Sequence, residues 1–212
     1  TMNQLRRSGT NAGVLMVTAY GIGGLSNLGT FGTDTGRVVS RIAPPLRMGI
    51  LGGWAVSEDE FLSYVGGATP EKSSGFGPLN QVGFAQYDVN YDPFSVETTA
   101  FGTNVKTFAS SMDNNVRLLA PLALPAGDQA MNALSMRGFG GITFASNTDR
   151  LTVTSGGLIG PRIDAAIGAA VDQGRLTAGM TGDLYIWNRQ NTLTINSRII
   201  DNPDSQIAVR SI

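Results

Sequence analysis

Residues 193–200 read Leu-Thr-Ile-Asn-Ser-Arg-Ile-Ile, a stretch in which apolar and polar side chains alternate. Leu193 and Ile195 share one side of an extended chain and Thr194 takes the other, because successive side chains of a strand point to opposite faces. One face of such a strand meets a core, while the other meets solvent or a partner. The stretch therefore predicts a half-buried β-strand.

Short segments of the same kind recur along the chain. They are rich in β-branched and aromatic residues and are bounded by Gly, Asn, Asp or Pro, which is typical of strands and turns. The predicted strands are 14–20, 37–43, 81–89, 94–101, 105–109, 116–119, 142–145, 151–154, 184–187, 193–200 and 207–210. Residues 188–191 are expected to turn one strand back onto the next as a hairpin, and residues 146–149 suggest a second hairpin.

Three segments, 57–66, 128–136 and 161–174, carry the start and stop signals of helices. The clearest is the first, where Ser57 precedes Glu60 as in a capping box and glycines follow the segment. The predicted fold is therefore mainly β, a sandwich or barrel with two or three short peripheral helices. A mixed α+β domain is the alternative.

The 212 residues are enough to bury a core without disulfides or a structural metal. Residues 1–12 are polar and predict an N-terminal arm, and residues 13–212 predict a single β-rich domain. Within that domain, Pro121 and Pro125 interrupt regular structure, so residues 118–127 predict an internal strap.

Composition excludes several classes of function. Charged residues make up 15% of the chain and the formal net charge is −1, so neither nucleic acid nor a membrane is an expected partner. The chain contains neither Cys nor His, which removes thiolate nucleophiles, zinc sites and the commonest general base. Instead it carries 28 Gly and many Ser, Thr and Asn residues. We therefore expect a polar but weakly charged surface.

Two strings invite an enzymatic interpretation. Residues 20–26 follow an apolar run as a dinucleotide-binding loop does, but Ser26 stands at the third glycine position, which favours a flexible loop. Residues 34–36, Asp-Thr-Gly, resemble the active-site triplet of the aspartic proteases, whose chemistry needs a second carboxylate. No second triplet occurs in the chain, so a surface turn is favoured. The sequence predicts a protein that is not an enzyme.

Asp88, Asn90 and Asp92 form the best ion-binding string. Side chains two apart in an extended segment point the same way, and their oxygens are ligands that calcium prefers. The string begins like an EF-hand loop, but Pro93 replaces the glycine and Thr99 the final glutamate. Solvated acids at a strand end are the alternative, and calcium is the one cofactor that the sequence suggests.

The basic residues point to protein interfaces. Of 15 basic residues, only Lys72 and Lys106 are lysines, and arginine is enriched where proteins meet because its guanidinium is weakly hydrated and forms planar paired bonds. Two places on the chain combine arginine with exposed or stiff backbone. They supply the predicted interface residues: Arg6 and Arg7 in the arm, and Pro44, Pro45 and Arg47 in the loop 43–51.

Many strands, abundant Gly, Ser, Thr and Asn, and little charge together resemble the structural proteins of bacteriophage virions. The resemblance implies a subunit that self-assembles into a larger array, as a capsid, tail or decoration component of a virion or extracellular assembly. Its partners would be copies of itself and other structural proteins. The alternative is a secreted or virion-borne carbohydrate-binding or adhesin module, with or without the assistance of calcium. In that case Tyr87, Tyr91 and Phe94 would form a sugar-stacking platform.

Overall fold

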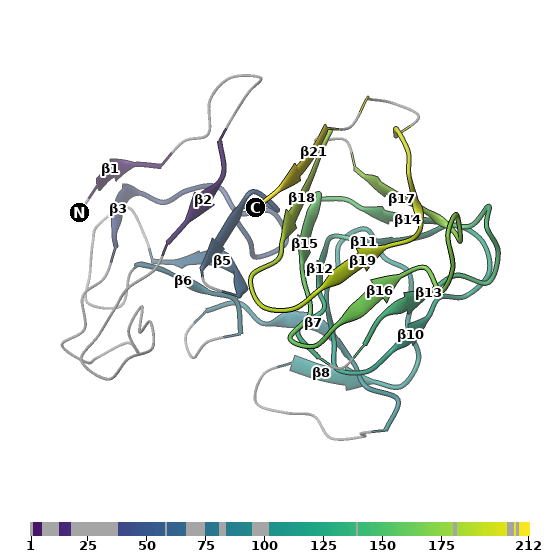
Figure 1. Cartoon of the computed structure of the whole chain (residues 1–212). Helices are drawn as coiled ribbons and strands as arrows, with labels where there is room; N and C mark the ends of the chain where they lie inside the picture. Colours follow the sequence, from purple (N-terminus) through teal and green to yellow (C-terminus); the bar gives the residue numbers. More distant parts are fainter. Residues whose placement is uncertain are drawn as a thin grey trace. The chain divides into compact units, whose positions relative to one another are not determined.

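The computed structural model describes residues 2–5, 13–17, 38–57, 59–66, 75–80, 84–94, 102–138, 140–179, 182–202, 206 and 208–212. Within these ranges every regular element is a β-strand (Figure 1). The same ranges contain no helix that is long and apolar enough to cross a membrane. The chain divides into two compact units, unit 1 (Thr1–Gln86) and unit 2 (Tyr87–Ile212).

Unit 1 is built on two sheets in its described part. One pairs β1 (Met2–Gln4) in parallel with β3 (Ser40–Ile42). The other runs in the order β2 (Leu15–Met16), β4 (Ala55–Ser57), β5 (Glu60–Val65) and β6 (Gly75–Pro78), and its last three strands are antiparallel. Tyr64 packs edge-on against Phe76 in the core, and its hydroxyl donates a hydrogen bond to the Ser40 carbonyl at 2.8 Å. The buried tyrosine thus ties β5 to β3.

Unit 2 repeats one arrangement of three short strands. Over its described residues four such groups follow one another, and we call them coils 1 to 4. They are β10 (Leu122–Ala123), β11 (Gln129–Met131) and β12 (Ala133–Ser135); β13 (Ile142–Thr143), β14 (Arg150–Val153) and β15 (Gly157–Ile159); β16 (Ala165–Ile167), β17 (Arg175–Ala178) and β18 (Asp183–Trp187); and β19 (Leu193–Ile195), β20 (Arg198–Ile199) and β21 (Ala208–Ser211).

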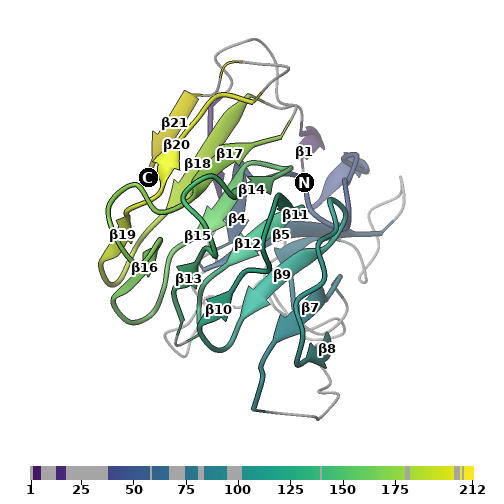
Figure 2. The same cartoon turned by 90° about the vertical axis from the view of Figure 1, so that its right-hand side faces the viewer.

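Equivalent strands of successive coils pair in parallel and form three sheets (Figures 1 and 2). Sheet 1 has the order β10-β13-β16-β19 and sheet 2 the order β11-β14-β17-β20. Sheet 3 has the order β21-β18-β15-β12 and continues through β9 (Asn115–Leu118), β7 (Tyr87–Tyr91) and β8 (Gly102–Val105). Since each strand pairs one coil back and one coil forward, unit 2 is a parallel β-solenoid.

The core of the solenoid consists of apolar columns that run from coil to coil. Leu151 is in register with Leu176, and Leu176 is in register with Ile199 in the next coil. Buried residues of all three sheets join one continuous hydrophobic cluster. A single coil has too little apolar surface to form a core of its own. Stacking apolar residues on apolar residues from coil to coil buries them together.

Polar side chains join the turns of neighbouring coils. The Asn196 amide donates to the Gly168 carbonyl at 2.9 Å, and the Gln173 amide donates to the Phe144 carbonyl at 3.2 Å. In the interior, the Asn132 amide donates to Asn115 Oδ1 at 2.8 Å. These bonds satisfy polar groups that the turns cannot pair internally. They account for part of the polar, uncharged composition.

The predicted sandwich or barrel with peripheral helices, and its α+β alternative, are wrong, because the described residues form a parallel solenoid without helices. Ser57 lies opposite Glu60 in an antiparallel pair, so the supposed capping box is a reversal between two strands. Polar residues of this kind favour turns as well as helix starts. Residues 128–136 contain β11 and β12, and residues 161–174 contain β16.

Both predicted hairpins are also wrong. Residues 188–191 join β18 to β19, and residues 146–149 join β13 to β14, but the two strands of each pair belong to different sheets. The proline-flanked segment 118–127 contains β10, and Leu122 and Leu124 are buried members of the core. The predicted arm 1–12 includes β1, whereas residues 6–12 lie outside the described residues.

Replacing Gly174 with Ala tests whether close coil stacking requires glycine. Gly174 has a φ of 76°, and an added Cβ would come within 2.2 Å of Phe144 Cγ. Gly127 also has a positive φ, 88°, but an added Cβ meets nothing within 4 Å. We expect Gly127→Ala to lower the free energy of unfolding by about 1 to 2 kcal/mol through backbone strain alone. Gly174→Ala should lower it by about 1 to 3 kcal/mol more, through overpacking.

Urea unfolding followed by circular dichroism measures both free energies. Equal losses in the two variants would show that the Phe144 contact relaxes without cost.

Candidate functional site

The predicted interface residues are only partly described. Arg6 and Arg7 lie outside the described residues, as do the two enzyme-like strings 20–26 and 34–36. Pro44 is buried, whereas Pro45 and Arg47 are exposed. The structure therefore leaves two of the five predicted interface residues on the described surface.

The loop that carries Arg47 is a tight reversal. Backbone hydrogen bonds join Arg47 and Ile50 in both directions, at 2.8 and 3.1 Å. Met48 and Gly49 between them have φ values of 49° and 76°, the pattern of a type I′ turn. Ile50 is buried while Leu46 is exposed. The loop therefore both anchors itself in its own unit and presents an apolar side chain to solvent.

The predicted calcium ligands have other hydrogen-bond partners. Asp88 Oδ2 accepts a hydrogen bond from the Asn115 backbone N–H at 2.8 Å. Asp92 Oδ1 accepts one from the Phe94 N–H at 3.0 Å, and Asn90 is buried. Among the described residues no three acidic side chains gather into a group that could hold a metal ion. Calcium binding stays a prediction.

The three aromatic residues of the predicted sugar platform are separated by burial. Tyr87 is buried, with the Arg117 guanidinium 5.8 Å from its ring centroid, and Tyr91 packs against the core. Phe94 is 85% exposed. Only one of the three rings is therefore fully available to a ligand.

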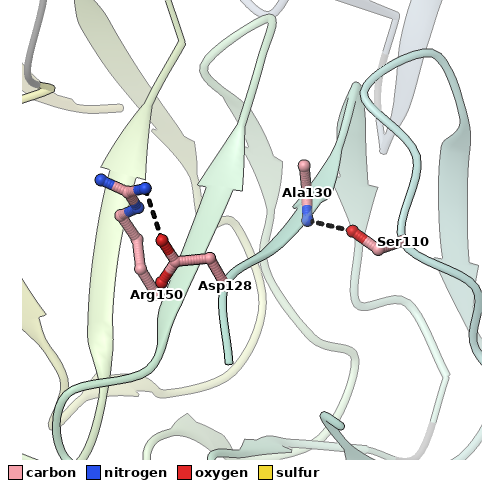
Figure 3. Close-up of polar contacts among 4 residues, drawn as sticks. All are labelled: Ser110, Asp128, Ala130 and Arg150. Carbon is pink, nitrogen blue, oxygen red and sulfur yellow. Dashed lines mark hydrogen bonds and ion pairs between the residues drawn. The ribbon is translucent and has the colours of Figure 1, made fainter. Parts of the chain in front are cut away.

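The first coil of the solenoid is capped at sheet 2. The Ala130 N–H donates to Ser110 Oγ at 2.8 Å (Figure 3). The Ser111 N–H donates to the Ala130 carbonyl at 2.9 Å. Phe108, from the same segment, is buried in the core. Residues 106–114 thus occupy the outer edge of β11 and satisfy backbone groups that face away from coil 2.

Coil 4, at the other end, has no such cap within the described residues. The apolar columns of the core end there with partly exposed side chains. In sheet 2, Leu176 is 0% exposed and its register partner Ile199 is 38% exposed. In sheet 3, Leu184 is 0% exposed and its partner Val209 is 48% exposed. As far as the described residues show, the hydrophobic core is therefore open to solvent at coil 4.

The backbone of coil 4 is open as well. Ala208 and Ile212 donate their N–H groups to the carbonyls of Gly182 and Ile186 in coil 3. Because alternate residues of a strand turn their backbone groups to opposite neighbours, Val209 and Ser211 direct theirs away from coil 3. No described strand pairs with the outer edges of β19, β20 or β21. Coil 4 thus presents three edges to which further strands can add.

The two arginines of the coil 4 strands are paired with acids of coil 3. Arg198 Nε lies 3.6 Å from Asp172 Oδ1, and Arg210 Nε lies 3.4 Å from Asp183 Oδ1. Surface pairs like these add little stability, but they cancel charge locally. The open end is therefore apolar and close to neutral along its strands.

A column of three arginines follows the outer side of sheet 2. Arg150, Arg175 and Arg198 are in register in three successive coils. Arg150 forms an ion pair with Asp128 at 2.6 Å (Figure 3). Among the described residues, Arg175 in the middle of the column forms no ion pair. Considering the described residues alone, its guanidinium is the one in this column that remains available to an external anion.

Ile199 and Val209 fall in predicted strands, but no local pattern in the sequence indicates that they end the core columns. Alternation within each strand is visible in the sequence. Which strand is the last of a stack is not, because its neighbours in the sheet lie about 25 residues away along the chain, as in β-helical repeats.

Comparison of the chain with known protein families, with curated proteins and with solved structures gives no significant match.

Replacing Ser110 with Ala should weaken the contact between residues 106–114 and the outer edge of β11 in coil 1. The Ala130 N–H loses its side-chain acceptor, and a hydrogen bond of about 1 kcal/mol corresponds to a roughly fivefold faster exchange of that amide. Hydrogen exchange followed by NMR measures the rate. Ser111→Ala is the matched control, because the Ser111 backbone N–H still bonds to the Ala130 carbonyl. Equal rates in the two variants would contradict a capping role for the Ser110 hydroxyl.

Proposed function

We propose that the protein is a non-enzymatic structural subunit that associates through the open end of its solenoid, formed by coil 4. The observation that carries this proposal is the exposure of the last residue of two core columns. Leu176 and Leu184 in coil 3 are fully buried, but their register partners in coil 4, Ile199 and Val209, are not. An uncapped solenoid end exposes apolar surface and unpaired strand edges at once, and such ends usually require a cap.

Association would stabilise coil 4 in two ways. Added strands would accept and donate the hydrogen bonds that Val209 and Ser211 direct outward, and apolar side chains of the partner would cover Ile199 and Val209. The low charge of the chain, with a formal net charge of −1, supplies little repulsion between copies. A role in a virion, which the composition suggested, stays a prediction.

Replacing Val209 with Lys should weaken association by about tenfold or more, because lysine on an exposed strand edge opposes pairing with another chain. The control is Val171→Lys, the same change at a side chain that is 82% exposed and lies outside the strands of coil 4. Light scattering across a concentration series gives the association constant, and circular dichroism checks that both variants fold. Equal association of the two variants would locate the contact elsewhere.

A carbohydrate-binding module is the second candidate function. The observation that favours it is the arginine column of sheet 2, in which Arg175 forms no ion pair among the described residues. The backbones of in-register residues are spaced by the distance between strands, about 4.8 Å. An acidic polysaccharide could lie along this column and accept paired hydrogen bonds from Arg175, since Arg150 and Arg198 already pair with acids.

Replacing Arg175 with Gln should then weaken the binding of an acidic polysaccharide such as polygalacturonate by about tenfold, the usual effect of losing a charge-assisted hydrogen bond. Arg47→Gln removes an exposed arginine of unit 1 and serves as the control. Calorimetric titration with polygalacturonate measures both. No binding by the unaltered protein, or equal loss in the two variants, would exclude the arginine column as a glycan site.

A further inference from the structure

We infer that two copies of the chain join coil 4 to coil 4, end to end, about a two-fold axis that passes between Val209 of β21 in one copy and Val209 in the other. The inference rests on the proposed function and adds the partner, the symmetry and the register. The product is a closed dimer, because the open end of each copy is used up in the contact.

The two ends of the solenoid are not equivalent, and this selects the orientation. A head-to-tail stack would place coil 4 of one copy on coil 1 of the next. At coil 1, however, Ser110 and Ser111 already occupy both backbone groups of Ala130, and Phe108 already fills the core. Among the described residues, coil 1 leaves only the outer edge of β10 unpaired, because β9 already pairs with β12, whereas coil 4 leaves all three of its edges unpaired, so two coil 4 ends meet.

A second copy matches the chemistry of this end. A two-fold axis perpendicular to the solenoid reverses every strand, so β21 of one copy would pair antiparallel with β21 of the other. Arg198 and Arg210 are each compensated by an acid of their own chain, Asp172 and Asp183, so the two ends do not repel. The exposed Ile199 and Val209 of each copy would meet apolar side chains of the same kind and close the core.

The register follows from the charges of β21. Val209 and Ser211 direct their backbone groups outward, so an antiparallel pair must join residues of this set. Pairing Val209 with Ser211 would put Arg210 opposite the second copy of Arg210, and like charges directly opposite one another are unfavourable. Pairing Val209 with Val209 puts Arg210 opposite Ala208 instead. Pairing Ser211 with Ser211 also avoids the repulsion, but it brings two hydroxyl side chains together. The register that pairs Val209 with Val209 avoids the repulsion and brings two apolar side chains together.

An engineered thiol tests this geometry directly, because the chain contains no cysteine. Cα atoms of a hydrogen-bonded antiparallel pair lie about 5.5 Å apart, within the range that a disulfide spans. Val209→Cys should therefore link two copies under mild oxidation, and most of the protein should migrate at twice the mass of one chain on a non-reducing gel. Val171→Cys, an exposed thiol outside the coil 4 strands, should stay at the mass of one chain.

Light scattering of the unaltered protein distinguishes failure of the two-fold dimer from failure of the proposed assembly role. A mass of two chains together with selective linking of Val209→Cys supports the inference. A mass above two chains, or a dimer in which Val209→Cys links no better than Val171→Cys, overturns the two-fold contact at Val209 while the proposed assembly role stands. A monomer at every concentration overturns both.

Discussion

The hydrogen bonding of each coil to its neighbours is the constraint on which unit 2 depends. Every strand of a coil is two to five residues long and pairs in parallel with strands of the neighbouring coils or, for β12, with β9. A coil removed from the stack would have neither backbone partners nor a core, so the stability of each coil is largely an interface property. The first and last coils are therefore special, because each lacks a complete neighbouring coil on one side among the described residues.

Stacking at the spacing between strands also dictates the composition of the turns. Where successive turns touch, an added Cβ would collide with backbone, as at Gly138 against the Leu118 carbonyl and at Gly179 against Thr154. Between such points, Asn, Gln, Ser and Thr side chains bond to the backbone of the next turn, as Ser155 does to the Asn132 carbonyl. Charged side chains would have to lose water at these contacts, which explains why uncharged polar residues serve there.

The same constraint accounts for the asymmetry on which the functional argument rests. The chain before coil 1 supplies a cap, with Phe108 in the core and two serines on the edge of β11. At coil 4 the described chain supplies none, and Ile199 and Val209 are left partly exposed. The arginine column of sheet 2 has the same origin, since in-register stacking aligns Arg150, Arg175 and Arg198 although they are distant in sequence.

The sequence by itself determined that much of the chain is extended: residues 116–119, 151–154, 184–187 and 207–210 were predicted as strands and largely coincide with β9, β14, β18 and β21. Alternation and β-branched content are local properties, so they survive in any β fold. The three helices were misread because capping residues and glycines serve turns equally well. Parallel pairing, the order of the coils and the exposure of Val209 were decided only by tertiary structure, because partners in a parallel stack are set by contacts between distant residues and leave no local signal.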